Sequence, residues 1–357
     1  MSEILKNSFG CDFVLKLPKE RKNTKIKLLQ LTDMQIIDAS QRRTPDRLRS
    51  DEIEAWSPDK FDVNCGDHIR SLVAQTKPDM IFMTGDLVYG SFDDNGTVFE
   101  WFCDFMDSFE IPWAPVFGNH DNESARGVDW QCERLAASEF CMFRRGEVTG
   151  NSNYTVGIAV GDVLVRVMHM LDTHGCLNKV SLYPDQVELM RSNTATINKA
   201  VGKNVPAFVA FHIPTPEFAE ADRAKGYLTE DRTYYTIGVD VQSLDGDFGM
   251  KYECSERKYP LMGSYLADYK ACFVDAVFAG HWHNVNTCIS HEGIKWVYGL
   301  KTGQYDYHVP GSLGGTLVTL EGDSFNVAHV PSIVPPAPFP GGASFFKNYF
   351  VSGSYSN

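Results

Sequence analysis

Five short apolar runs, each closed by polar residues of the kinds that bind metal ions, limit the fold of this 357-residue chain more than any other feature. The runs are rich in Ile, Val and Phe and have the length of buried strands; they cover residues 26–31, 80–83, 114–117, 207–211 and 274–279. In an α/β sheet the loops at the carboxyl ends of the strands meet in one crevice. Polar residues far apart in the sequence are therefore expected to come together there.

The residues that close the runs carry carboxylate, amide and imidazole groups. They are Asp33-Met34-Gln35, Gly85-Asp86, Gly118-Asn119-His120-Asp121, Phe211-His212 and Gly280-His281-Trp282-His283. Such side chains bind ions of the Mg, Mn, Fe and Zn group. A lone Gly-Asp is usually a turn and a lone His is usually a packed or surface residue, so the inference rests on the whole ordered set.

The set is large enough for a site with two metal ions, which lie roughly 3.5–4 Å apart and clamp the attacking and leaving oxygens of an in-line displacement. One carboxylate must bridge the ions, and Asp86 is the candidate. The other ligands divide into one group for each ion: Asp33, Gln35 and His283 for the first, and Asn119, His212 and His281 for the second. A hydroxide between the ions would attack phosphorus, because coordination can lower the pKa of water to about 7. His120 is left to stabilise charge on the phosphoryl group or to protonate the leaving oxygen.

These blocks resemble the signature of the calcineurin-like metallophosphoesterase superfamily, which runs D-x-H/Q, G-D, G-N-H-D/E, H and G-H-x-H. All five occur here in that order, from Asp33 to His283. Extensions at residues 111–121, 211–214 and 298–303 resemble the purple-acid-phosphatase-related branch that includes the Dcr-type phosphatases of fungi and plants. The resemblance implies an α/β fold, a sandwich of two mixed β-sheets flanked by helices.

One ligand position has two candidates. Gln35 stands where many members of the superfamily have His, but a manganese-dependent ADP-ribose and CDP-alcohol hydrolase branch also has D-x-Q, which implies that Gln35 still ligates. An amide oxygen there favours harder ions such as Mn or Mg. Residues 85–89 also fit the G-D-x-x-Y of purple acid phosphatases, in which the tyrosine, here Tyr89, binds ferric iron. One ion has little use for both, and the sequence favours Gln35, with Tyr89 lining the substrate pocket.

Four other histidines lie in less specific surroundings. His174 follows an apolar run and His308 follows two tyrosines, so both are candidate substrate contacts, with ordinary packed or surface residues as the alternative. His169 lies inside an apolar run and is expected to be a core residue. His68 lies in a stretch with helical spacing and is expected on the solvated face of that helix.

The layout of the blocks predicts a single domain over residues 1–330, because a boundary between the blocks would cross the site. Helices are expected over residues 98–107, over residues 130–140 and after Pro184. Residues 219–259 interrupt the strand and helix pattern and are interpreted as an insertion or lid, or as a solvated excursion without a role in substrate choice. The tail, residues 331–357, begins with prolines, and its aromatic residues predict docking onto the domain.

Composition narrows the partners. The formal net charge is −13 and no basic stripe is present, which argues against a nucleic-acid partner. No run is long enough to span a bilayer and the first residues lack the apolar core of a signal peptide, so no membrane partner and a cytoplasmic location are expected. The nine cysteines include no C-x-x-C pair, and reduced thiols are the simpler expectation.

The sequence therefore predicts a hydrolase of phosphate mono- or diesters that uses two metal ions, Mn, Fe, Zn or Mg, and acts on a small phosphorylated molecule or a phosphoprotein. A nucleoside-diphosphate hydrolase of the ADP-ribose or CDP-alcohol type is the alternative that Gln35 supports. A metal-binding scaffold without catalysis is the alternative from another class, and His120 argues against it.

Overall fold

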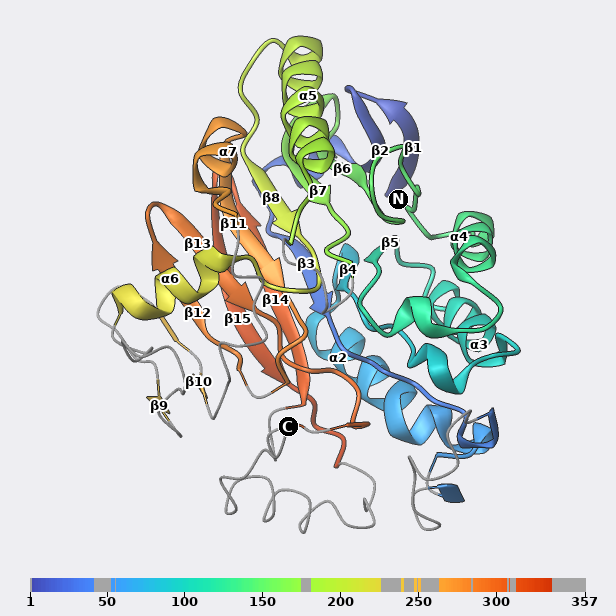
Figure 1. Ribbon diagram of the computed structural model, residues 1–357. Coiled ribbons are helices and arrows are strands. Elements are labelled where there is room, and N and C mark those ends of the chain that lie inside the picture. Colours follow the sequence, from blue (N-terminus) through green and yellow to red (C-terminus); the bar gives the residue numbers. More distant parts are fainter. Residues whose placement is uncertain are drawn as a thin grey trace.

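The structure is a computed structural model that describes residues 2–41, 53–54, 56–174, 181–225, 239–240, 247–248, 250–251, 263–283, 285–306, 308 and 313–335. Within these residues two large mixed sheets pack face to face, and helices flank them (Figure 1). The sandwich of two mixed sheets expected from the sequence is confirmed.

The first sheet has eight strands in the order β1-β2-β6-β7-β8-β11-β13-β12. Their bounds are β1 (Glu3–Ser8), β2 (Cys11–Leu17), β6 (Tyr154–Val160), β7 (Val163–Met170), β8 (Ala207–Ala210), β11 (Val274–Ala279), β13 (Ile294–Tyr298) and β12 (Cys288–His291). Strands β7, β8, β11 and β13 are parallel to one another. The carboxyl ends of β8 and β11, which precede two of the predicted ligand blocks, therefore lie side by side.

The second sheet has five strands in the order β15-β14-β3-β4-β5. Their bounds are β15 (Ser324–Pro331), β14 (Gly314–Glu321), β3 (Ile26–Leu31), β4 (Met80–Thr84) and β5 (Trp113–Val116). Strands β3, β4 and β5 are parallel, so the other three ligand blocks also leave one edge together. A short antiparallel pair, β9 (Val239–Asp240) and β10 (Met250–Lys251), completes the described strands.

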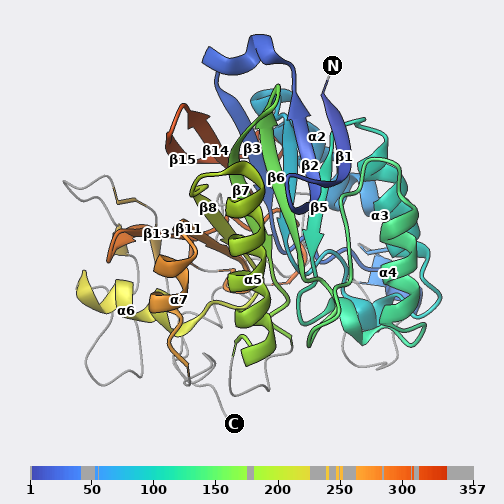
Figure 2. The same cartoon turned by 90° about the horizontal axis from the view of Figure 1, so that it is seen from above.

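Helices cover the outer faces of both sheets (Figures 1 and 2). Beside the five-stranded sheet lie α2 (Asp67–Thr76), α3 (Thr97–Asp107) and α4 (Val128–Ala137); beside the eight-stranded sheet lie α5 (Pro184–Val201), α6 (Pro216–Ala224) and α7 (Leu266–Ala271). Short helical turns connect them: η1 (Lys19–Asn23), η2 (Ala39–Gln41), η4 (Pro58–Lys60), the π-helix η5 (Asp62–Gly66), η6 (Gly90–Phe92) and η7 (Asp121–Glu123). The helices expected over residues 98–107 and after Pro184 are present. The third begins earlier than expected, at Val128 directly after Gly127, and it ends earlier because the chain is already extended at Ser138.

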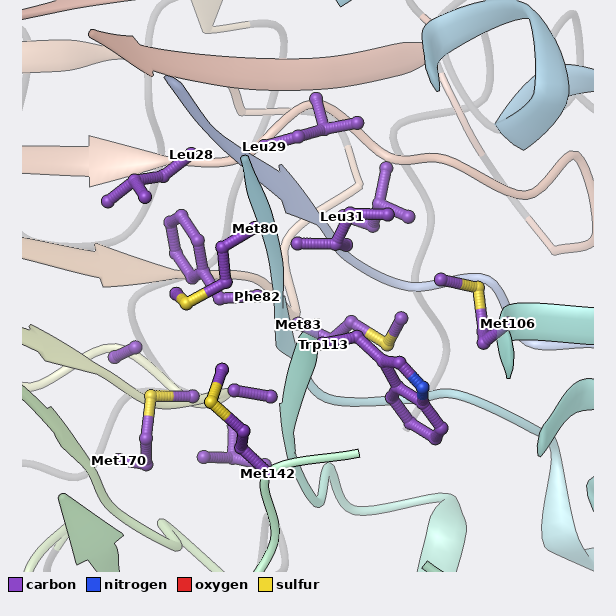
Figure 3. Close-up of a cluster of buried hydrophobic side chains, with 14 of the residues drawn as sticks. Leu28, Leu29, Leu31, Met80, Phe82, Met83, Met106, Trp113, Met142 and Met170 are labelled. Carbon is purple, nitrogen blue, oxygen red and sulfur yellow. The ribbon is translucent and has the colours of Figure 1, made fainter. Parts of the chain in front are cut away.

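The core between the sheets is aromatic and aliphatic. Figure 3 shows Leu31 and Phe82 of the five-stranded sheet in one buried cluster with Met142 and Met170. Edge-to-face contacts join the sheets, since the ring of Phe82 lies 5.2 Å from that of Phe278 in β11. Such pairs add about 0.5–1.5 kcal/mol to the free energy gained by burial. Because β4 and β11 both carry ligand blocks, this packing also holds the two halves of the candidate site together.

A buried arginine near the start of β11, on the side away from the ligand blocks, also joins the two sheets. Arg166 of β7 is 2% exposed, and its Nη1 donates to both oxygens of Asp275 in β11, at 2.6 and 2.8 Å. Its guanidinium lies 4.2 Å from the ring centre of Phe208 and 5.3 Å from that of Phe325 on the opposite sheet. Cation–π contact and the ion pair therefore reinforce each other.

We predict that Arg166→Ala lowers the free energy of unfolding by about 3 kcal/mol, because it leaves the Asp275 carboxylate without its partner in a largely buried position. The matched control is Lys16→Ala, which removes the more exposed pair between Lys16 and Asp162 and should cost less than about 1 kcal/mol. Urea unfolding followed by circular dichroism measures both. Equal losses in the two variants would contradict the assigned role of Arg166.

Two of the histidines weighed from the sequence are core residues. His169 is buried in β7 as expected, with its Nε2 3.3 Å from Thr194 Oγ1 in α5, and burial lowers its pKa to about 4. The expectation for His68 is wrong: it is fully buried in α2, and its Nδ1 lies 2.8 Å from Ser332 Oγ. Helical spacing alone could not reveal that the segment after β15 covers this face.

We predict that His169 makes the protein less stable in mild acid. The unfolded residue titrates near pH 6.5 and the folded one near pH 4, so the unfolded chain binds more protons between these values. Its contribution to stability is complete above about pH 6.5 and is lost as the pH falls towards about 4. Urea unfolding of the wild type and of His169→Gln at pH 7, 6 and 5 should show a shallower pH slope for the variant. Parallel slopes would exclude this role.

Several other expectations concern segments that the structure describes in part. Residues 219–259 are described only through Lys225 and in three short pieces, and the tail only to residue 335, so the lid, the docking tail and the single domain stay predictions. Among the described residues, no helix has the length and apolar character needed to cross a lipid bilayer. The described cysteines are buried and free: Cys11, Cys65, Cys103, Cys132, Cys141, Cys272 and Cys288.

Candidate metal centre

The five ligand blocks meet where the carboxyl ends of the two sheets face each other. Each block follows its strand: residues 33–35 follow β3, 85–86 follow β4, 118–121 follow β5, 212 follows β8 and 280–283 follow β11. Main-chain hydrogen bonds join neighbouring loops, from Asp33 N to Gly85 O at 3.1 Å and from Gly280 N to His212 O at 3.0 Å. The positions of the ligand-type residues are thus fixed by the backbone.

Four of the predicted ligands have a left-handed backbone. The φ angles are 53° at Asp33, 46° at Gln35, 52° at Asp86 and 71° at His281. Residues with a Cβ rarely adopt this conformation, and it costs of order 1–3 kcal/mol at each position. Strain of this kind gathers at functional sites, where the surrounding structure holds it in place. Here it turns successive side chains towards one point.

Glycines allow the loops to approach so closely. A Cβ on Gly118 would lie 2.2 Å from Asp86 Oδ1, and one on Gly280 would lie 2.0 Å from Thr32 Oγ1. A Cβ on Gly85, whose φ is +88°, would lie 2.7 Å from the His212 ring. The glycines of the blocks are therefore required by close packing around the acidic residues.

Asp86 lies at the centre of the cluster. Its Oδ1 accepts a hydrogen bond from the His120 main-chain N at 3.0 Å and lies 3.3 Å from His212 Nε2, while its Oδ2 accepts from Gln35 Nε2 at 3.0 Å. Asp33, Asp86 and His212 are all buried and each offers a ligand atom within 4.8 Å of the others. Burial would raise the pKa of Asp86, but the neighbouring His212 and His120 hold it well below its ordinary value.

The contacts of His212 test whether a cation fits. Its Nδ1 donates to the carbonyl oxygen of Thr84 at 2.7 Å, so the lone pair of Nε2 points away from that bond. Nε2 lies 3.1 Å from Asn119 Oδ1 and 3.3 Å from Asp86 Oδ1, which are also acceptors. Acceptors meet here and need a positive charge between them. Burial lowers the pKa of His212, but the effect of Asp86 is larger and raises the pKa to about 9. In the metal-free protein a proton on His212 therefore supplies the positive charge between these acceptors. The residues fit a metal ion.

Asp33 and the two histidines after β11 form the other side of the cluster. His283 Nε2 lies 3.1 Å from Asp33 Oδ1, and Asp33 Oδ2 accepts from Thr32 Oγ1 at 2.7 Å and from His281 N at 3.1 Å. Burial opposes ionisation of Asp33, but His283 and His212 lower its pKa to about 2. Burial and the nearby His212 lower the pKa of His281 to about 3, which leaves its ring neutral, as a metal ligand must be.

The contacts of Gln35 include a residue that was not predicted to be part of the site. Lys301 is buried, and its Nζ donates to Gln35 Oε1 at 2.7 Å and to the main-chain oxygen of Asp33 at 2.8 Å. Burial lowers the pKa of Lys301, opposed by the nearby carboxylates. The sequence showed Lys301 only as part of the family-like stretch after β13, without a signal that its ammonium reaches Gln35.

His120 lies beside the cluster with its ring held on two sides. Its Nδ1 lies 3.1 Å from Glu123 Oε1, and the ring stacks on Tyr89 with centroids 3.7 Å apart. Burial would lower the pKa of His120, but Asp86 and Glu123 outweigh it and raise the pKa. Tyr89 also packs edge to face with Phe92 and Tyr305, so this tyrosine belongs to an aromatic wall beside His120.

The other two candidate substrate contacts differ in their positions. The His174 ring packs on Tyr183, and its Nε2 lies 3.1 Å from Gln186 Oε1 at the start of α5, so its contacts are with that helix. His308 is half-buried, with its Nδ1 3.2 Å from the main-chain oxygen of Asp306. Burial lowers the pKa of His308 to about 4, and the charges of Lys301 and His283 act in the same direction. Because Asp306 Oδ2 lies 3.9 Å from His283 Nδ1, the contact with Asp306 places His308 near the cluster.

Asp121 supports the ligand loops although it was not assigned a role. Its carboxylate accepts hydrogen bonds from Val88 N at 3.1 Å and from Gly118 N at 2.6 Å, which links the loops after β4 and β5. Burial, with Asp86 nearby, raises the pKa of Asp121 to about 8. The acid that ends the G-N-H-D block therefore has a structural role.

Comparison with known proteins agrees with the blocks. Residues 26–285 match the calcineurin-like phosphoesterase family. "Probable inactive purple acid phosphatase 28" of Arabidopsis thaliana is 26% identical over 317 residues, which cover 80% of this chain and 71% of that protein. "Phosphatase DCR2" of Saccharomyces cerevisiae is 25% identical over 217 residues, 56% of this chain and 36% of that protein. A solved dimetal phosphatase from Danio rerio is 10% identical with a TM-score of 0.47, covering 87% of this chain and 99% of its own. The predicted superfamily and branch are confirmed by the family match and the relatives.

We predict that Gly118→Ala lowers the affinity for Mn²⁺ at least about tenfold, because the added Cβ would displace Asp86. The matched control is Gly202→Ala at the end of α5, where φ is +71° and nothing lies within 4 Å of the new Cβ. That variant should lose about 1 kcal/mol of stability and keep its Mn²⁺ affinity. Calorimetric titration with Mn²⁺ measures both, and an unchanged affinity in Gly118→Ala would show that Asp86 is not a ligand.

Proposed function

The chain belongs to the calcineurin-like phosphoesterase family, and from this premise we propose that it is a metal-dependent hydrolase of phosphate mono- or diesters. The observation that carries the proposal is the arrangement at His212, whose Nε2 faces two oxygen acceptors at 3.1 and 3.3 Å. A buried group of this kind needs a cation. The adjacent His120 supplies a proton donor beside the same point.

Seven side chains are the ligand candidates predicted from the sequence: Asp33, Gln35, Asp86, Asn119, His212, His281 and His283. Bound ions would supply Lewis acidity towards a phosphoryl oxygen and a lowered pKa for bound water. The mixture of carboxylate, amide and imidazole suits Mn, Fe, Zn or Mg.

The role proposed for His120 follows from its contacts. Glu123 engages Nδ1, which leaves Nε2 to meet a phosphoryl or leaving-group oxygen. Against the effect of burial, Asp86 and Glu123 raise the pKa of His120, which favours the protonated ring that can donate a proton or neutralise negative charge. Tyr89 fixes the plane of the ring by stacking. In this proposal Tyr89 and His308 are candidate substrate contacts.

The proposed substrate is a small phosphorylated molecule or a phosphoprotein. A chain with a net charge of −13 repels a polyanion such as nucleic acid, whereas metal ions provide local positive charge for a single phosphate. Some relatives carry the word inactive in their names, which keeps the scaffold without catalysis as the contrasting outcome. Hydrolysis of ADP-ribose or CDP-alcohols is the alternative within enzymes.

We predict that the Mn²⁺-loaded protein hydrolyses p-nitrophenyl phosphate or its bis ester, and that excess EDTA abolishes turnover. Substitution His120→Asn should lower kcat about 10²- to 10⁴-fold, the usual contribution of a positioned acid, while Mn²⁺ content stays unchanged. His291→Asn on the edge strand β12 is the control and should keep full activity.

The same assay separates the alternatives. Turnover of ADP-ribose alone would favour the nucleoside-diphosphate hydrolase. Tight Mn²⁺ binding without turnover of any of the three substrates would favour the scaffold, and an unchanged kcat in His120→Asn would remove that residue from the mechanism.

A further inference from the structure

The amide of Gln35 is held between a donor and an acceptor. Lys301 Nζ lies 2.7 Å from one end of the amide, and Asp86 Oδ2 lies 3.0 Å from the other. A lysine side chain offers donors and no acceptor in its ammonium form, whereas an ionised carboxylate only accepts. The amide oxygen of Gln35 must therefore face Lys301, and its NH₂ group must face Asp86.

Reversing this amide is costly. The turned group would set its NH₂ against the ammonium of Lys301 and its oxygen against the carboxylate of Asp86. Both hydrogen bonds would be lost in a buried place, and a buried donor or acceptor left without a partner is strongly unfavourable, most of all when it is charged. Gln35 thus presents hydrogens, which cannot coordinate a metal ion, towards the carboxylate at the centre of the site.

Lys301 also brings positive charge to the same side of the cluster. Its Nζ donates to the main-chain oxygen of Asp33 at 2.8 Å, and the residue is only 3% exposed, so solvent screens it poorly. A cation beside Asp33 opposes a second cation bound to that carboxylate. Two effects weaken the same metal position: the observed orientation of the Gln35 amide, with its oxygen on Lys301, and the fixed charge of Lys301.

The opposite side of the cluster lacks this obstacle. Asn119 Oδ1 lies 3.1 Å and Asp86 Oδ1 lies 3.3 Å from His212 Nε2. Within the described part of the chain, no lysine or arginine donates to Asn119 or His212. These atoms are available to one ion as they stand.

We propose that Lys301 makes the metal centre asymmetric: one ion binds tightly to Asp86, Asn119, His212 and His281, and the position of Asp33 and His283 binds a second ion weakly because Lys301 withholds the oxygen of Gln35. Gln35 is then a positioning residue for Asp86 rather than a ligand, in contrast to the expectation from D-x-Q. The inference deepens the proposed function and rests on it only in requiring that the site binds metal.

The test is metal binding by the full chain, with Mn²⁺ alone as the probe. Calorimetric titration of metal-free wild type should show one tight and one weak site, and electron paramagnetic resonance at one equivalent should show isolated Mn²⁺ ions. Lys301→Met should raise affinity at the weak site about 10- to 100-fold, the range that residues around metal ligands usually control. At two equivalents its spectrum should show spin-coupled pairs. Lys301→Arg keeps the charge and is the matched control, with wild-type stoichiometry.

Three outcomes would overturn the inference or its premise. Two equally tight sites in the wild type, or weaker binding of the second ion by Lys301→Met, would mean that Lys301 orients Gln35 as a ligand; the proposed hydrolase would stand. No Mn²⁺ binding in any variant would remove the proposed function as well. If Lys301→Met does not fold, as judged by circular dichroism, Lys301→Gln replaces it, because its amide can still donate to Asp33 O without carrying a charge.

Discussion

The meeting of acceptor atoms around His212 is the constraint on which the rest of the centre depends. Oxygen and nitrogen lone pairs repel one another when water is excluded, so the fold must force them together and then supply a proton or a metal ion. The main-chain bonds between the loops, the left-handed backbone at Asp33 and Asp86, and the glycines at 85, 118 and 280 all serve this end. The left-handed conformation is unfavourable alone, and the main-chain bonds and the close packing at the glycines hold it in this one arrangement.

The energy that holds this arrangement comes from packing below it. Four of the five strands that carry ligand blocks, β3, β4, β8 and β11, are interior strands of their sheets, and β5 is an edge strand. The contact of Phe82 in β4 with Phe278 in β11 joins the two sheets across the core. A central parallel strand is buried on both faces, which explains why the ligands follow continuous apolar runs rather than alternating patterns. The packing of the sheets offsets the cost of the left-handed backbone at the ligand residues.

The burial of these parallel strands on both faces explains how much of the fold could be predicted from the sequence. Continuous apolar runs predicted the strands before each ligand block to within about one residue, and the blocks identified the side chains that now lie together. The burial of His68 was not predicted, because it depends on a contact with Ser332, 264 positions away. The orientation of Gln35 escaped for a similar reason, since its partner Lys301 is 266 positions away and a lysine after a strand carries no sign of burial. Contacts of this range are properties of the fold and not of local pattern.

Charge balance accounts for a buried lysine beside a metal centre. Asp33 and Asp86 are ionised and buried, and two uncompensated charges there would oppose folding. In the metal-free chain the proton on His212 and the ammonium of Lys301 offset them, so the site can form before it is loaded. The two cations are not equivalent when metal arrives. In the proposed two-metal centre, a bound ion would replace the proton on His212, whereas Lys301 would stay bound to Gln35. The lysine that balances charge in the metal-free chain would then also make the two proposed metal positions unequal.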